Sequence, residues 1–126
     1  MKLSWGRIVL AALAAEIVLL AILTAITRPL IGSGADSPVV LIGGFALMFL
    51  AGSWVAGKVR TRLMLHGVMV GVTSVVFYTV LAPGVTLAVL SNGSIVFIMA
   101  HLLKILGGAA GGWLAEQRAI RAATIA

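Results

Sequence analysis

Four apolar runs, each of about 20 residues, divide this chain and constrain its fold more than any other feature. The runs cover residues 8–27, 39–56, 63–82 and 94–115. Each is long enough to cross a hydrocarbon core of ~30 Å as a helix. A soluble domain of 126 residues could not hide the apolar surface of a chain that is 62% hydrophobic. The sequence therefore predicts an all-α membrane protein, a four-transmembrane-helix bundle that forms a single domain over residues 1–126.

Turn-forming segments separate the four runs. The first break reads TRPLIGSGADSP, in which Ser37 is expected to cap the second helix and Pro38 to open it. A tight polar turn, GKVRTR, precedes the third helix, and the third break reads APGVTLAVLSNGS. This last segment is compatible with a kinked continuation of the third helix or with a short surface helix. The first run begins with basic residues as a signal peptide does, but it is too long for one, so we expect an uncleaved helix.

The positive charges lie almost entirely on one side of the predicted bundle. Only Arg28 falls on the other side, and Lys104 falls inside the fourth apolar run. Because cytoplasmic loops carry the excess of Lys and Arg, both termini are expected in the cytoplasm. The other cations are Lys2, Arg7, Lys58, Arg60, Arg62, Arg118 and Arg121.

An internal repeat accompanies this layout. The sequence AGSWVA at residues 51–56 recurs as AGGWLA at residues 110–115, each time at the cytoplasmic end of a helix. We therefore expect two similar hairpins of the same orientation, a parallel duplication. Trp54 and Trp113 lie where indoles favour the headgroup boundary. Lys58, Arg60 and Arg62 are expected to bind anionic lipid headgroups, at ~1 kcal/mol for each basic residue.

Glycines at four-residue spacing predict the helix-packing surfaces. In lipid, helices associate through close packing of small residues rather than through the hydrophobic effect. The third helix carries such a pair, and the fourth helix carries two; Gly52 forms a weaker pair with Ala56 on the second helix. The paired glycines are Gly67 with Gly71, Gly107 with Gly111, and Gly108 with Gly112.

Polar side chains from three helices are predicted at one depth. At ~1.5 Å per residue from the basic end, Glu16 lies ~14 Å deep, Ser74 ~16 Å and Lys104 ~18 Å. An isolated charge at a helix centre costs ~2.5–3.5 kcal/mol, so we expect Lys104 to pair with Glu16. His101 and Tyr78 lie one turn further out and are expected to complete an intramembrane polar cluster. Such a pair can fix helix register or bind a proton, and the sequence favours neither role.

Several classes of function find no support in the residues. The chain has no Cys, which excludes disulfides and thiolate chemistry. The net charge of +6 lies at the ends of apolar segments, as topology signals do, so no nucleic acid is expected. No catalytic triad, metal-ligand cluster or phosphate-binding loop is present, and we expect neither enzyme activity nor a cofactor. His66, close to Arg60 and Arg62, is expected to belong to the basic cytoplasmic rim.

The segment 43–78 resembles a family of uncharacterised four-pass bacterial membrane proteins. Its pattern is a Gly-Gly pair, an Ala-Gly step, a basic turn, and then His-Gly with a second Gly four residues on. The matching residues are Gly43, Gly44, Ala51, Gly52, Lys58, His66, Gly67 and Gly71, with Gly107 and Gly108 as a second glycine pair. This resemblance implies a bacterial inner-membrane location and a four-helix fold, and it implies no specific activity.

The segment LAALAAEIV is similar to the first helix of the small multidrug resistance exporters. That resemblance implies that Glu16 is a carboxylate that binds protons and drugs. The chain lacks the aromatic and glycine signature of their third helix, and Lys104 would neutralise the carboxylate.

Two functions remain open from these patterns. The first is a non-enzymatic inner-membrane protein, an accessory or assembly subunit or a self-associating structural protein, with a homo-oligomer or a membrane-protein partner. The alternative is a small proton-coupled transporter or pore, with Glu16 as the titrating group and the rest of the polar cluster around it.

Overall fold

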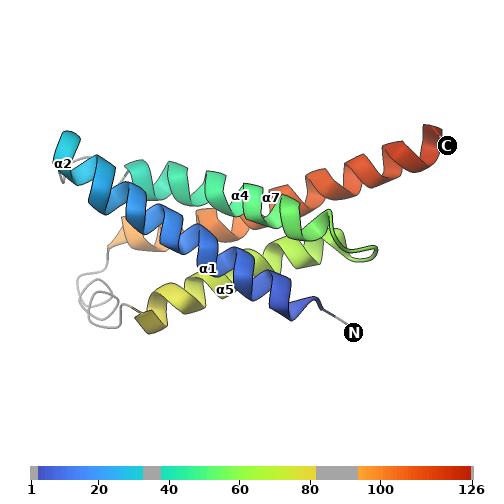
Figure 1. Ribbon diagram of the computed structural model, residues 1–126, viewed down its shortest axis with the longest axis horizontal. Coiled ribbons are helices and arrows are strands. Elements are labelled where there is room, and N and C mark those ends of the chain that lie inside the picture. Colours follow the sequence, from blue (N-terminus) through green and yellow to red (C-terminus); the bar gives the residue numbers. More distant parts are fainter. Residues whose placement is uncertain (1–2, 33–37, 82–93, 126) are drawn as a thin grey trace.

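The computed structural model describes residues 3–32, 38–81 and 94–125, and nearly all of these are helical (Figure 1). The helices are α1 (Trp5–Ala21), the π-helix η1 (Ile22–Thr27), α2 (Arg28–Leu30), the π-helix η3 (Val39–Gly43), α4 (Gly44–Ala56), α5 (Leu63–Leu81) and α7 (Ile95–Ile125). They form four continuous helices that are long and apolar enough to cross a membrane: Trp5–Thr27, Val39–Ala56, Leu63–Leu81 and Ile95–Ile125. The predicted all-α fold with four spans is confirmed, and the described ranges contain no strand.

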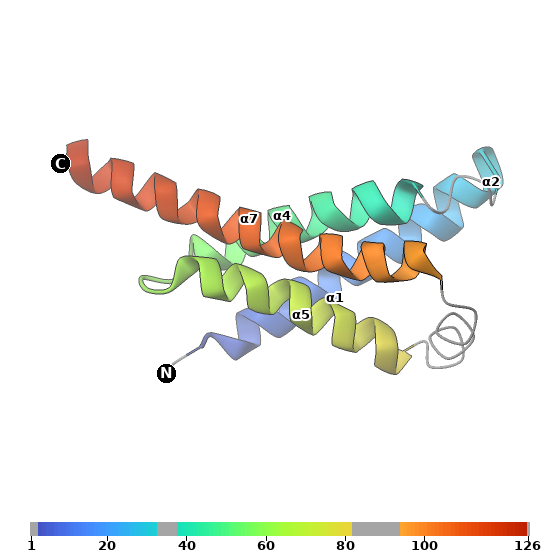
Figure 2. The ribbon, with the colours of Figure 1, turned by 180° about the vertical axis from the view of Figure 1, so that it is seen from behind.

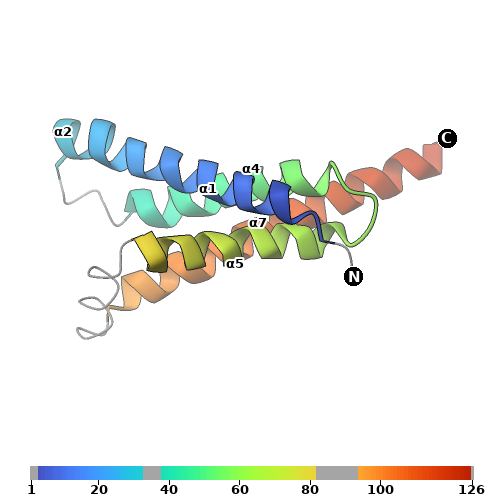
Figure 3. The same cartoon turned by 60° about the horizontal axis from the view of Figure 1, so that its bottom comes forward.

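The four helices pack as a bundle in which α7 lies against both α4 and α5 (Figures 1 and 2). On the other side of the bundle, α1 packs across α4 and α5 (Figure 3). Successive spans run in opposite directions, so both termini and the turn between α4 and α5 lie at one end (Figure 1). The N-terminal and C-terminal helices therefore run antiparallel, with α4 and α5 between them.

The helix boundaries follow the apolar runs closely, with two differences. The first span begins at Trp5 rather than at residue 8, and α7 continues to Ile125 instead of ending at residue 115. Pro38 precedes the second span, whereas the proposed cap Ser37 lies outside the described residues. The link expected over residues 83–94 also lies outside them, apart from Ser94.

Two π-helical segments lie at the end of the bundle away from the termini. They are η1 and η3, and they contact each other. In η1 the Thr24 hydroxyl donates a hydrogen bond to the Leu20 carbonyl at 2.7 Å. Side-chain bonding of this kind competes with the backbone ladder and bends a helix. The sequence pattern does not predict these wider turns.

Glycines allow α7 to contact α4 and α5 backbone to backbone. Gly107 and Gly111 face the carbonyls of Phe45 and Phe49 on α4, where a Cβ would collide. On α5, Gly71 would place a Cβ 2.6 Å from the Ile105 Cα of α7. The remaining glycines at these two seams are Gly52, Gly67, Gly108 and Gly112, which approach backbone atoms equally closely. The bundle is thus drawn together by small residues, as expected for helices in lipid.

The remaining core is apolar and lies where α1 meets α4 and α5. Its fully buried members include Ile8, Ala12, Met48 and Val70. Large apolar side chains also cover the outside of the bundle; among them, Leu50 is 62% exposed and Val80 68%. A soluble protein rarely exposes so much apolar surface. The outer surface therefore matches a lipid environment.

Candidate functional site

A buried ion pair joins the first and last spans near the middle of the bundle. The Lys104 ammonium lies 2.5 Å from Oε1 of Glu16. Glu16 is 2% exposed and Lys104 1%. Each charge removed from water is costly, and mutual neutralisation offsets that cost only with close geometry. The structure brings together the two charges that sequence depth placed at similar levels.

Ser74 brings α5 into the same cluster. Its hydroxyl donates a hydrogen bond to Oε1 of Glu16, the oxygen that also contacts Lys104. Ser74 is completely buried. One carboxylate oxygen thus accepts from two helices that are not its own, which links α1, α5 and α7 at a single point.

The second span, Val39–Ala56, contributes a glycine to the cluster rather than a polar side chain. A Cβ at Gly44 of α4 would lie 3.5 Å from both Cγ and Cε of Lys104. A Cβ at that distance would make ordinary van der Waals contact, so Gly44 lies directly against the lysine stem. That stem crosses the interior toward Glu16, although α1 itself packs mainly on α4 and α5. The glycine spacing in the sequence does not indicate that Gly44 belongs to this cluster.

An aromatic layer lies next to the ion pair. The Lys104 ammonium is 5.1 Å from the centre of the Tyr78 ring, within range of a cation–π interaction. His101 meets Tyr78 and Phe97 edge-on, with ring centres 5.2 and 4.3 Å away. Both ring nitrogens of His101 are buried and have no hydrogen-bond partner among the described residues. Within this part of the chain, His101 therefore joins the predicted cluster through ring contacts and not through hydrogen bonds.

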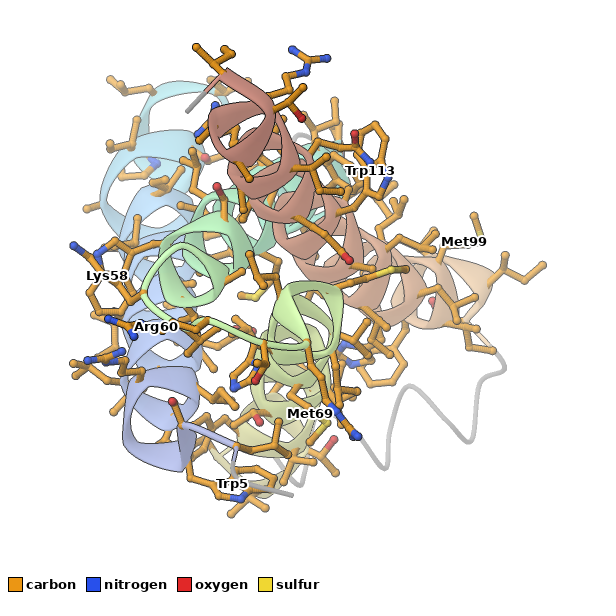
Figure 4. The ribbon with its side chains drawn as sticks, turned by 90° about the vertical axis from the view of Figure 1, so that its right-hand side faces the viewer. Trp5, Lys58, Arg60, Met69, Met99 and Trp113 are labelled. Carbon is orange, nitrogen blue, oxygen red and sulfur yellow. The ribbon has the colours of Figure 1, made fainter. Side chains whose placement is uncertain are left out.

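The predicted interfacial residues surround the end that carries the termini. Trp54 is 48% exposed and Trp113 54%, so each indole faces outward. Lys58, Arg60 and Arg62 are all exposed. Viewed along the bundle from this end, Lys58 and Arg60 lie beside α1, and Trp113 lies on the far side (Figure 4).

His66 does not belong to the basic rim, contrary to the expectation from sequence. It is only 2% exposed. Its Nε2 accepts a hydrogen bond from the Ser4 amide at 3.3 Å, and its Nδ1 lies 2.9 Å from the Arg62 carbonyl. This pattern requires the proton on Nδ1. His66 therefore fastens the start of α1 to the turn before α5, and the exposed rim consists of arginines and lysines.

The polar cluster can bind or release a proton, and it has few other chemical capacities. Glu16 offers a carboxylate, whose Oε1 accepts the hydrogen bond of the Ser74 hydroxyl and is paired with the Lys104 ammonium. Within the described ranges, no three His, Asp or Glu side chains come close enough to bind one metal ion. The groups that remain are a neutralised ion pair, a hydroxyl and an imidazole next to an aromatic layer.

Comparisons with known proteins identify no relative: no family model, no curated protein and no solved structure matches this chain.

Proposed function

We propose that this chain is a non-enzymatic accessory or assembly subunit of a bacterial inner membrane, built to bind another membrane protein. The observation that carries the proposal is the long C-terminal helix. At ~1.5 Å per residue, the 31 residues of α7 extend ~46 Å, well beyond a ~30 Å hydrocarbon core. Its last turns project from the bundle (Figure 1). We call residues 118–125 the C-terminal arm.

The C-terminal arm has the properties of a contact surface. All its residues are exposed, including Ile120 at 54%, which lies between Arg118 and Arg121, and Ile125 at 87%. A helical extension of this length is marginal in water without packing. Docking on a partner would bury the two isoleucines and stabilise the arm.

The interior of the bundle supports the same proposal. Lys104 neutralises the charge of Glu16, and Ser74 donates a hydrogen bond to the same carboxylate. A cluster of this kind fixes the register of the three helices that carry these residues. Close glycine contacts between α7 and its two neighbours leave the backbones little freedom to separate. The function then resides on the outside of the molecule.

Charge and repeat support a specific topology within this proposal. The cations Arg7, Lys58, Arg60 and Arg62 lie near the end that carries both termini, which favours an orientation with both termini in the cytoplasm. Trp54, from the first of the repeated AGxWxA segments, is two residues before the end of α4 that leads into this basic turn, and Trp113 comes from the second. We propose two hairpins of the same orientation, α1 with α4 and α5 with α7, related by a parallel duplication.

Affinity purification tests the accessory role. An N-terminally tagged chain is extracted from its native membranes in mild detergent, and its companions are identified by mass spectrometry. We expect a stoichiometric membrane-protein partner that is lost when residues 118–126 are deleted. Residues 118–125 are all exposed, so the rest of the bundle should stay helical and keep its melting temperature after the deletion.

Other outcomes of the purification are equally informative. A homo-oligomer that dissociates on deletion would assign the arm to self-association. Recovery of a lone monomer, or a partner retained by the shortened chain, would contradict the proposed role of the arm. A charge-neutral variant, Arg118→Gln with Arg121→Gln, distinguishes electrostatic docking from burial of the isoleucines.

A second function, proton-coupled transport, is favoured by one observation. His101 presents two ring nitrogens without partners among the described residues, one turn along α7 from Lys104. Buried ionisable groups in membrane helices often form proton relays. In this function Glu16 would exchange protons, and His101 and Tyr78 would lie on the route away from the basic end.

Proton flux into liposomes tests the second function. Purified protein is reconstituted with a pH-sensitive dye inside, and a pH step is imposed across the membrane. A transporter or pore should accelerate dye response over empty liposomes, and Glu16→Gln should abolish that acceleration while the protein remains folded. If the unmodified chain does not accelerate the dye response, proton flux through this protein in the absence of a substrate is excluded.

A further inference from the structure

An apolar groove runs along the outside of the bundle between α1 and α4. Its walls are residues 10–18 of α1 and residues 47–54 of α4, and its volume is about 530 Å³. Alanines make the room: Ala11, Ala14 and Ala15 on one wall and Ala51 on the other. Along α1 the groove covers about two helical turns, ~12 Å. It lies within the apolar belt, so its occupant must be apolar over this length.

Two cations lie at one end of this groove. Arg7 shares a helical face with Leu10, Ala11 and Ala14, at spacings of three, four and seven residues. Lys58 follows Trp54 by four residues, just beyond the end of α4. The Arg7 guanidinium donates a hydrogen bond to the Lys58 carbonyl at 2.7 Å. Both side chains are exposed. The groove is therefore apolar along its length and has two positive charges at one end.

We propose that this groove binds one anionic phospholipid, with an acyl chain between α1 and α4 and the phosphate at Arg7 and Lys58. A guanidinium donates paired hydrogen bonds to phosphate, and an ammonium adds a point charge. Trp54 lies between the two regions, 48% exposed, where an indole contacts both the acyl chain and the headgroup layer. The inference concerns a single lipid site and does not depend on a partner for the C-terminal arm.

Charge favours a lipid over a second copy of the chain. A two-fold symmetric dimer uses the same patch on both subunits. Two copies inserted in the same direction and joined through this groove would bring two sets of Arg7 and Lys58 close together, and like charges repel. An anionic headgroup instead neutralises both cations. The groove therefore matches a negatively charged ligand with an apolar tail.

Native mass spectrometry of the full chain tests the site. Protein in mild detergent is titrated with phosphatidylglycerol or with phosphatidylcholine of the same acyl chains. We expect one phosphatidylglycerol per chain at concentrations where phosphatidylcholine does not bind. The variant Arg7→Gln with Lys58→Gln should bind phosphatidylglycerol roughly 10- to 30-fold more weakly. The matched variant Arg118→Gln with Arg121→Gln removes the same charge elsewhere and should bind as the unmodified chain does.

A second variant tests the acyl-chain part of the site without changing any charge. Ala14→Leu fills the groove from an exposed position, so the bundle should fold normally, and lipid binding should weaken. Ala119→Leu, on the exposed arm, is the control and should have no effect. Equal binding of both lipids, equal loss in the two charge variants, or unchanged binding by Ala14→Leu would overturn the proposal. A dimer that Ala14→Leu dissociates would also overturn it, because the occupant would then be protein.

Discussion

Replacing Lys104 with methionine is expected to destabilise the bundle by about 3–5 kcal/mol, since breaking a buried ion pair leaves the other charge unpaired. Methionine keeps most of the volume of the stem, so the loss reports the charge rather than a cavity. Among the described residues, Glu16 would then keep only the hydrogen bond from the Ser74 hydroxyl and no counter-charge. Unfolding of purified protein by a denaturing detergent, followed by circular dichroism, measures the free energy.

A double-mutant cycle separates the interaction free energy of the Glu16–Lys104 pair from the effect of each substitution alone. Glu16→Gln should also destabilise, because the Lys104 ammonium then lacks a counter-charge. The double variant Glu16→Gln with Lys104→Met should cost less than the sum of the two single changes, by about 1–3 kcal/mol. Additive effects would contradict a direct pair. Lys58→Met is the matched control: this lysine is exposed in the turn after α4, so its change should stay within ~0.5 kcal/mol.

The spans themselves could be predicted because hydropathy and length decide them. The second helix occupies residues 39–56 as expected, and the third is helical from residue 63 to residue 81, where the described range ends. The continuation of α7 to Ile125 was missed because the last segment is not apolar. It contains Ala, Glu, Gln and Arg, which favour helices regardless of hydropathy. An apolar pattern therefore locates the membrane part of a helix and not its end.

The common depth of the buried polar residues could be predicted by counting residues along each helix. The way in which the helices pack against one another could not. Counting residues from the basic end placed Glu16, Ser74 and Lys104 close together in depth, and the structure joins all three at one oxygen. The same count says nothing about which helices are neighbours. In the structure α1 packs mainly on α4 and α5, and the ion pair forms because a lysine stem spans the interior beside Gly44.

His66 shows where proximity in sequence misleads. It lies close to two arginines along the chain, which suggested an exposed basic rim. On a helix, however, His66 shares a face with Val70 and Ser74, four and eight residues on, and that face is buried. The helical spacing was thus the informative signal. Its hydrogen bond from Ser4 could not be anticipated, because it depends on the approach of the N-terminus.

Gly71→Ala is expected to destabilise the bundle, because Gly71 is one of the glycines at which an added Cβ would strike the backbone of a neighbouring helix. A Cβ at this position would lie 2.6 Å from the Ile105 Cα and 2.7 Å from the Lys104 carbonyl oxygen. Both are backbone atoms, so no side chain can rotate away, and α5 must move from α7. Overpacking typically costs about 1–3 kcal/mol, and rigid backbone on the receiving side favours the upper end. The intrinsic helix preference for alanine, ~1 kcal/mol, offsets only part of that cost.

Gly6→Ala provides the matched control for this substitution. Gly6 lies in the first turn of α1, and a Cβ there would meet nothing within 4 Å. The same chemical change should therefore leave the unfolding free energy unchanged or raise it by up to ~1 kcal/mol. A loss as large for Gly6→Ala as for Gly71→Ala would contradict a steric seam and indicate a general sensitivity to glycine replacement.

The seam and the ion pair should be energetically coupled, because the Lys104 carbonyl is one of the atoms that a Cβ at Gly71 would strike. Moving α7 away from α5 shifts the Lys104 ammonium relative to Glu16, and the Ser74 hydroxyl on α5 moves from the same oxygen. Gly71→Ala should thus cost less in the background that already lacks both charges, by about 0.5–3 kcal/mol. Detergent unfolding of the four proteins measures the difference. An equal cost in both backgrounds would mean that close packing and the buried charges stabilise the bundle independently.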